Sequence, residues 1–215
     1  MPFFRRQTVW WPTWLGFGLM AGVAAAVGSL WWFRAEPFLS VTDKVPADVL
    51  VVEGWIGGPG IRAAAHEFAF GGYRFVVATG PLTGERWYDR RWNYAEIAQQ
   101  QLSKAGVPEA DILMAPAGDP EEQRTYRMAV AARDALVARS LQPRSINIFT
   151  RGSHGRRSRL VYEKVFGPET KIGVISWLPP GYETEPWWHS SDRAEDLLKE
   201  TVGYAFERTL RSGRW

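Results

Sequence analysis

The sequence predicts an α/β protein whose soluble part contains a mainly parallel five-stranded sheet. Two observations lead to this prediction. A long uncharged apolar segment lies near the N-terminus, and after it five short apolar segments alternate with five segments in which apolar residues recur at helical spacing. Strands that alternate with helices in this way form parallel sheets with helices packed on both faces.

The uncharged segment covers residues 10–33, which as a helix is long enough to cross a hydrocarbon core of about 30 Å. Aromatic residues stand at both of its ends, in the pattern of a membrane-spanning helix; they are Trp10, Trp11, Trp14, Trp31, Trp32 and Phe33. A cleaved signal peptide is the alternative, but its apolar region would be only about 7–15 residues long and would end in small residues. We therefore expect an uncleaved transmembrane helix after a short tail at residues 1–9.

The orientation of this helix follows from the basic residues at its ends. Arg5, Arg6 and the N-terminal amine outweigh Arg34 and Lys44 by a narrow margin. The positive-inside rule then favours an N-terminus inside the cell and a soluble part outside, in a periplasm or an equivalent compartment.

Residues 34–45 are predicted to be a linker and residues 46–215 a single domain. Five short apolar runs predict its strands, with Gly54 ending the first and Gly80-Pro81 closing the second. The predicted strands are residues 46–53, 74–79, 111–115, 145–150 and 171–176.

Helical spacing of apolar residues predicts a helix after each strand. The third helix has the clearest start, because Asp119 can act as N-cap and Pro120 can occupy the first turn. The predicted helices are residues 60–71, 93–105, 119–140, 154–166 and 192–211. Together these elements predict a Rossmann-like three-layer domain preceded by one N-terminal transmembrane helix.

Arg, Gly and Trp residues follow the predicted strands. Because the carboxyl ends of parallel strands meet at one edge, where such sheets bind ligands, we expect these residues to share a site. Arg and helix N-termini suit phosphate or carboxylate, and Trp suits a sugar ring or a bilayer surface. The alternative is that the Arg side chains are solvated and the Trp side chains cover the core. The residues are Glu53, Gly54, Trp55 and Arg62 after the first strand, Thr79, Gly80, Arg86, Trp87, Tyr88, Arg90 and Arg91 after the second, Arg151, Gly152, Ser153, His154, Arg156 and Arg157 after the fourth, which ends at Thr150, and Trp177, Trp187, Trp188 and His189 after the fifth.

The most specific local segment is residues 149–159. Ser153 can cap the following helix, and His154 and Arg157, three residues apart, share one face of it. The helix dipole favours a neutral His154 that is available as a base or a hydrogen-bond partner. A solvated basic turn is the alternative.

Composition excludes several other kinds of site. The net charge is +3 without a long run of Lys and Arg, so no nucleic-acid partner is expected. No cysteine and only three histidines are present, so no metal site is expected. The glycines at 58 and 60 lie too far from the first strand for a dinucleotide fingerprint, and the second strand ends without an acidic residue. The cofactor and the protein partners are not defined by the sequence.

Several short motifs occur in an order that resembles a known family. They are Ala47–Gly54, Arg62, Gly72–Gly80 with Thr79, Glu96, Gly106-Val107-Pro108, Thr125, and residues 150–157 with Thr150, His154 and Arg157. This pattern resembles a domain-of-unknown-function family of bacterial envelope proteins that includes SanA, ElyC and YdcF. The resemblance covers nearly the whole soluble part and implies a single-pass protein of the bacterial inner (plasma) membrane with a periplasmic domain. It also implies a role in peptidoglycan or polysaccharide lipid-carrier metabolism and in barrier function, with no assigned reaction.

Three functional hypotheses follow. In the first, the protein acts on a lipid-linked phosphorylated saccharide at the bilayer, and His154 or Glu96 exchanges the proton. Glu96 has an alternative role, since it forms a capping box with Asn93. In the second, the domain binds a nucleotide or S-adenosylmethionine. In the third, it is a non-catalytic scaffold whose partner surface is formed by Trp177, Trp187 and Trp188. The candidate ligand-binding residues are Gly54, Arg62, Thr79, Gly80, Thr125, Thr150, Ser153 and Arg157.

Overall fold

A computed structural model describes residues 11–87, 90–118, 123–182, 184–210 and 212–213, with side chains described outside residues 84–90. The chain divides into two compact units, residues 1–35 and residues 36–215. The boundary falls within one helix, so the second unit begins with the last turn of that helix.

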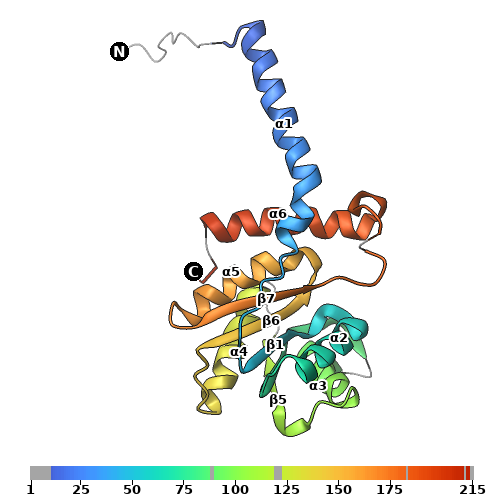
Figure 1. The fold of residues 1–215 in the computed structure, drawn as a ribbon, viewed down its shortest axis with the longest axis vertical. Helices are drawn as coiled ribbons and strands as arrows, with labels where there is room; N and C mark the ends of the chain where they lie inside the picture. Colours follow the sequence, from blue (N-terminus) through green and yellow to red (C-terminus); the bar gives the residue numbers. More distant parts are fainter. Residues whose placement is uncertain (1–10, 88–89, 119–122, 183, 211, 214–215) are drawn as a thin grey trace. The chain divides into compact units, whose positions relative to one another are not determined.

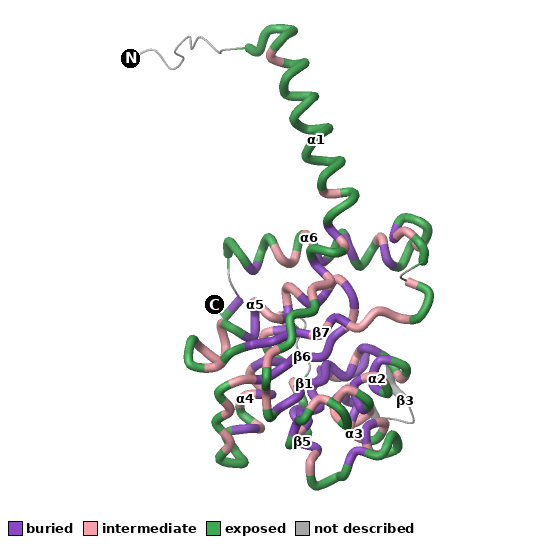
Figure 2. The backbone as a smooth tube through the Cα atoms, in the orientation of Figure 1, coloured by how far each residue is buried: buried purple, intermediate pink, exposed green. Residues whose placement is uncertain are grey.

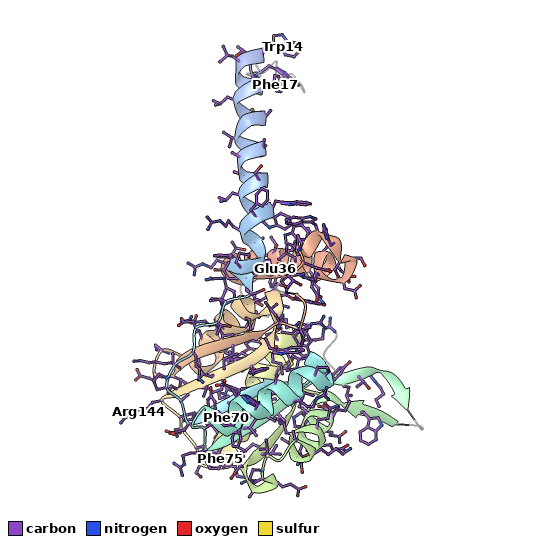
Figure 3. All side chains as sticks on the ribbon, turned by 45° about the vertical axis from the view of Figure 1, so that its right-hand side comes forward. Trp14, Phe17, Glu36, Phe70, Phe75 and Arg144 are labelled. Carbon is purple, nitrogen blue, oxygen red and sulfur yellow. The ribbon has the colours of Figure 1, made fainter. Side chains whose placement is uncertain are left out.

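Helix α1 makes up most of the described part of the first unit and runs from Trp14 to Leu39. By length and composition it is apolar enough to cross a membrane. Its side chains, including Trp14 and Phe17, stand out from the helix, which is exposed along most of its length (Figures 2 and 3). The helix continues past residue 33, the predicted end, because the following Arg34, Ala35 and Glu36 are themselves compatible with a helix.

The second unit is built on a five-stranded sheet (Figure 1). All its strands are parallel, in the spatial order β5-β2-β1-β6-β7. The sheet grows outward from β1 in one direction and then, from β6 onward, in the other, so its topological switch point lies between β1 and β6. The strands are β1 (Val49–Glu53), β2 (Phe75–Gly80), β5 (Ile112–Pro116), β6 (Ser145–Arg151) and β7 (Lys171–Trp177).

Helices cover both faces of this sheet, which confirms the predicted Rossmann-like α/β architecture. Alternate residues of β1 enter opposite cores, and the strands are buried on both sides (Figure 2). One core is completed by α2 (Gly57–Phe70) and α3 (Tyr94–Lys104), and the other by α4 (Arg124–Ala138) and α5 (Gly155–Phe166). Helix α6 (Ser191–Thr209) packs against α5.

Two elements differ from the prediction. Residues predicted to connect the second strand to the second helix contain an antiparallel hairpin, β3 (Leu82–Trp87) and β4 (Arg90–Asn93). Helix α4 begins at Arg124 because Gln123 has a left-handed backbone (φ 54°) that a continuous α-helix does not accommodate. The predicted cap at Asp119 lies outside the described residues.

Segment 41–45 is hydrogen-bonded to the body of the domain. Asp43 forms an antiparallel bridge with Val174 on the edge strand β7, and the backbone N–H of Ser176 donates to Thr42 Oγ1. Near the amino end of β6, the side chain of the fully buried Asn147 bonds both backbone groups of Val45. This part of the predicted linker is therefore an ordered part of the domain.

Candidate functional site

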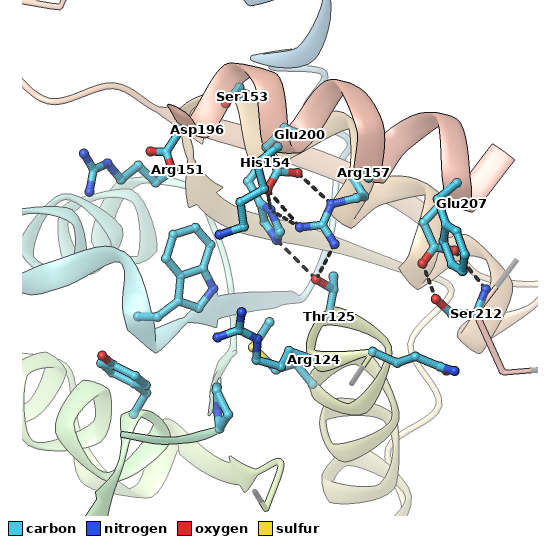
Figure 4. Close-up of a pocket in the computed structure, with 18 residues that line it drawn as sticks. Arg124, Thr125, Arg151, Ser153, His154, Arg157, Asp196, Glu200, Glu207 and Ser212 are labelled. Atoms are coloured by element: carbon cyan, nitrogen blue, oxygen red, sulfur yellow. Dashed lines mark hydrogen bonds and ion pairs between the residues drawn. The ribbon is translucent and has the colours of Figure 1, made fainter. Parts of the chain in front are cut away.

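A cavity of about 720 Å³ lies at the carboxyl end of the sheet, beside the switch point. Its wall is formed by the segments that follow β1, β2 and β6, by the first turn of α4, and by one side of α6 (Figure 4). We call it the switch-point cavity. Its lining residues include Trp55, Pro81, Tyr94, Arg124, Thr125, Arg151, Ser153, His154, Arg157, Asp196, Lys199, Glu200, Phe206 and Glu207.

Behind this wall lies Glu53, the last residue of β1, which is fully buried. Each of its carboxylate oxygens accepts a hydrogen bond from a hydroxyl group. Thr150 donates to Oε2 at 2.6 Å, and Ser158 donates to Oε1 at 2.9 Å. A carboxylate that accepts on both oxygens is stabilised in a position where an isolated charge would be very costly.

His154 lies on the cavity wall between two buried carboxylates. Its Nδ1 is 3.0 Å from Glu200 Oε1, and its Nε2 is 3.5 Å from Glu53 Oε2. Nε2 is also 3.4 Å from the hydroxyl of Thr125, and the indole of Trp55 meets the imidazole edge-to-face at 5.0 Å. These contacts from four elements fix the position of the ring.

Arg157, in the first turn of α5, pairs with Glu200 through two hydrogen bonds (Figure 4). Nε donates to Oε2 at 2.6 Å and Nη2 donates to Oε1 at 2.9 Å. Burial opposes the ionisation of Glu200, but the attraction of His154 and the hydrogen bonds from Arg157 outweigh it and hold the pKa of Glu200 well below its ordinary value. Burial would also lower the pKa of Arg157, but Glu200 raises it above its ordinary value.

Glu53, His154, Arg157 and Glu200 form what we call the buried charge cluster. Nδ1 of His154 has a partner in either protonation state, since it can donate to Glu200 Oε1 or accept from Arg157 Nη2 at 3.0 Å. His154 therefore has a hydrogen-bond partner at the cavity wall whichever ring nitrogen carries the proton.

Three further cations, which we call the rim cations, line the cavity: Arg124, Arg151 and Lys199. Arg151 donates to the Tyr182 hydroxyl at 3.2 Å, whereas Arg124 and Lys199 are exposed and form no ion pair within the described part of the chain. Of the acidic lining residues, Glu200 is paired with Arg157, Glu207 is paired with Lys164, and Asp196 is exposed. Among the described lining residues, the three rim cations therefore outnumber the one acidic side chain that has no ion pair.

The structure brings several predicted site residues together. Thr125, Ser153, His154 and Arg157 line the cavity, and Thr150 lies behind it on Glu53. Arg157 donates to the hydroxyl of Thr125 at 3.1 Å, which connects α5 to the first turn of α4.

Other predicted residues near the strand ends have internal contacts. A Cβ at Gly54 would collide with the carbonyl oxygen of Tyr94, and a Cβ at Gly80 would collide with the side chain of Tyr94. The buried hydroxyl of Thr79 donates to the carbonyl oxygens of Ala115 at 2.9 Å and Met128 at 3.2 Å. These three positions hold the α3 and α4 segments against β1 and β2.

Arg62 and Glu96 are not among the lining residues. Arg62 is exposed on α2, near Gly58. Glu96 accepts a hydrogen bond from the backbone N–H of Asn93 at 3.2 Å, and the side chain of Asn93 accepts one from the N–H of Ala95. These two bonds form the capping box that the sequence offered as the alternative role of Glu96. The role of Glu96 at the helix start thus has a direct structural explanation.

Sequence reasoning missed Glu200, because α6 reaches the cavity only through tertiary packing. For Glu53 a signal existed, since an acidic residue that ends a run of buried Val and Leu must find a partner. The Trp residues of the scaffold hypothesis do not form one exposed surface. Trp187 is buried, Trp177 packs against a core, and Trp188 is 40% exposed.

Within the described residues, no group of three or more His, Cys, Asp and Glu residues is arranged to hold a metal ion. The fold and the cavity define an α/β protein of Rossmann-like topology with a charged site at its switch point. Comparisons with protein-family models, with curated proteins and with solved structures find no match to this chain.

Proposed function

We propose that the protein is anchored in a membrane by α1 and binds a phosphate-bearing anion in the switch-point cavity. The charge distribution of the cavity supports this most directly. Glu200 and Glu207 are already paired with Arg157 and Lys164, so the charges left for a ligand are the three rim cations and the single carboxylate of Asp196. Guanidinium and ammonium groups on a partly enclosed wall favour phosphate over a neutral ligand.

The first turn of α4 adds to this preference. Arg124 and Thr125 begin the helix at the cavity, where backbone N–H groups and the helix dipole favour negative charge. Trp55 offers an aromatic ring to a sugar, and the buried charge cluster can exchange a proton with a bound group. A lipid-linked phosphorylated saccharide combines these features with membrane anchorage, as in peptidoglycan or polysaccharide lipid-carrier metabolism and envelope barrier function.

A nucleotide or S-adenosylmethionine is the second candidate ligand. The observation in its favour is the position of the cavity, since Rossmann-like sheets bind nucleotides at the switch point. Two details weigh against it. The hydroxyl of Thr79, at the end of β2, is used by Ala115 and Met128, and no acidic residue ends that strand to bind a ribose.

The test is isothermal titration calorimetry of the full chain in a non-ionic detergent with inorganic pyrophosphate. We expect the double variant Arg124→Ala/Lys199→Ala to bind pyrophosphate about tenfold or more weakly, since hydrogen bonds to charged groups are worth about 1.5–3 kcal/mol each. The matched control is Lys104→Ala/Arg139→Ala, which removes two exposed cations that do not line the cavity.

Two results would overturn the proposal. One is a wild-type chain that does not bind pyrophosphate, and the other is a control that loses as much affinity as the rim variant. Titration with ATP and with S-adenosylmethionine under the same conditions separates the two candidates. A nucleotide that binds tightly while pyrophosphate does not would favour the second.

A further inference from the structure

Helix α6 exposes a stripe of large apolar side chains to solvent. They recur every four residues, so they lie along one face of the helix and its end. Leu198 is 55% exposed, Val202 71%, Phe206 39% and Leu210 56%. The face that packs on the domain carries Leu197, Glu200 and Glu207 instead. We call the four exposed residues the α6 stripe, which is about 18 Å long at the α-helical rise per residue.

The α6 stripe reaches the switch-point cavity. Phe206 belongs to the stripe and also lines the cavity, and Lys199, next to Leu198 in the sequence, is a rim cation. An apolar surface thus borders a site with positive charge at its mouth. This combination matches a ligand with a negatively charged headgroup and an apolar chain.

The path of the chain indicates what covers the stripe. At the start of the second unit, Glu36 pairs with Arg193 on α6 at 2.6 Å. Phe38 meets the ring of Tyr204 edge-to-face at 5.6 Å. Residues 36–38 continue directly from the apolar part of α1. The first residues of the second unit, which follow the candidate membrane span in the chain, therefore pack on α6.

Charged residues accompany the stripe. Lys199 and Arg208 are exposed on α6, as are Asp192, Glu195 and Asp196, and the guanidinium of Arg156 lies over the ring of Phe38 at 3.9 Å. Charged side chains of both signs therefore flank the stripe, and its apolar face is the part suited to a membrane interface. The continuity of residues 36–38 with the candidate membrane span is the observation that favours a bilayer as the occupant.

We propose that the α6 stripe lies in the membrane interface and that the switch-point cavity takes its ligand from the bilayer. The ligand is then an amphiphile with a phosphate or diphosphate headgroup on an apolar chain. This inference rests on the proposed function, because the headgroup occupies the cavity described there. The stripe contacts the bilayer and brings the cavity mouth to the level of the headgroups.

The chain contains no cysteine, so a single introduced cysteine can be labelled without background. We compare Val202→Cys on the stripe with Val137→Cys on α4, a valine that is 57% exposed. Each variant is labelled with an environment-sensitive fluorophore and reconstituted into phosphatidylcholine/phosphatidylglycerol vesicles that contain nitroxide-labelled lipid. Quenching at least about twofold greater at Val202 than at Val137 is expected for an interfacial helix.

Equal quenching at the two positions would overturn the inference. So would energy transfer between differently labelled Val202→Cys copies without lipid quenching, because the stripe would then be covered by a second copy of the chain.

A binding experiment separates this inference from the function on which it rests. The double variant Leu198→Gln/Val202→Gln should bind inorganic pyrophosphate like the wild type. It should bind farnesyl diphosphate carried in vesicles about tenfold more weakly, because two apolar contacts with the bilayer are lost. Val137→Gln is the matched control and should leave both affinities unchanged.

If wild-type binding of pyrophosphate fails, the proposed function fails, whatever the quenching shows. The second case is that the wild type binds pyrophosphate, but the stripe variant and the wild type have equal affinity for farnesyl diphosphate in vesicles. Only the present inference then fails.

Discussion

Asn147 and Glu53 are fully buried polar side chains on neighbouring strands, one near the amino end of the sheet and one at its carboxyl end. The amide of Asn147 is saturated by the protein itself. Its Oδ1 accepts from the N–H of Val45 at 3.0 Å, and its Nδ2 donates to the Val45 carbonyl at 2.7 Å and to the Tyr73 hydroxyl at 3.0 Å. None of these groups lines the cavity.

At the carboxyl end, the buried polar groups are charged and border an open cavity. Glu53 has two hydroxyl donors, but its third neighbour, His154, faces the cavity and a second carboxylate. A buried ion pair adds little stability compared with well-packed apolar side chains, and it is costly to break. The buried polar group at the amino end therefore serves the stability of the fold, whereas the charged groups at the carboxyl end lie where a ligand can reach them.

The largest effect is expected when the buried charge cluster loses its permanent cation. Arg157→Leu leaves Glu200 buried without its bidentate partner and should lower the free energy of unfolding by about 3 kcal/mol. Urea unfolding of the full chain in non-ionic detergent, followed by near-ultraviolet circular dichroism, measures this change. Arg159→Leu on the same helix is the control, because its partly exposed pairs with Asp43 and Glu163 should be worth less than about 1 kcal/mol. Equal losses would show that the cluster is no more critical than a surface pair.

A smaller loss of stability, without a loss of binding, is expected at the amino end. Asn147→Leu leaves both backbone groups of Val45 without their partner, while the Tyr73 hydroxyl keeps its bond to Glu67, and this should cost about 2 kcal/mol. The same unfolding assay measures this cost. Isothermal titration calorimetry of the folded variant should show an unchanged affinity for pyrophosphate. The exposed bond from Ser103 to Glu109 provides a control, and Ser103→Ala should change stability very little. Weaker pyrophosphate binding by Asn147→Leu would break the distinction between the two ends.

The pH dependence of stability sharpens the same comparison. Since the pKa of Glu200 is lower in the folded protein, the unfolded chain binds more protons, and stability is lost as pH falls below the ordinary value of 4.5. Between pH 7 and about pH 3.5 this should remove on the order of 1 kcal/mol, which Glu200→Gln should not lose. Urea unfolding at a series of pH values measures both chains. Parallel pH profiles would contradict a specific role for Glu200.

The smallest effect is expected at Glu96. If its carboxylate serves the capping box, Glu96→Ala should lower stability by about 1 kcal/mol and leave pyrophosphate affinity unchanged. Glu96→Gln keeps a hydrogen-bond acceptor and should retain most of that stability. A large loss of binding in both variants would instead assign Glu96 to the ligand.

The sequence predicted the fold because each strand and helix is encoded locally. The alternation of Val-rich runs with helical spacing is visible without tertiary information, and so is the order of the elements. The hairpin β3–β4 was missed because its strands are short and polar. The start of α4 was missed because Asp119 and Pro120 form a strong helix-start signal, whereas nothing in the sequence indicates the left-handed backbone of Gln123.

The candidate site was only partly predictable. His154, Arg157 and Ser153 could be placed at the cavity because they follow a parallel strand directly. Arg62 follows a strand as well, but the rotation of α2 about its axis leaves it exposed, and rotation is set by packing. Glu200 reaches His154 from α6, and no local pattern indicates which face of a distant helix will meet the segment that follows β6.

The ordered segment 41–45 has a consequence for association between molecules. The edge strand of a sheet presents unpaired backbone groups that can recruit another strand. Here Asp43 pairs with Val174, and Val41 and Thr42 form hydrogen bonds with Ser176, so this segment covers the outer edge of β7. Substituting Asp43 by proline would remove the N–H that bonds Val174. The uncovered edge of β7 should then promote aggregation, which light scattering of the full chain in detergent would detect.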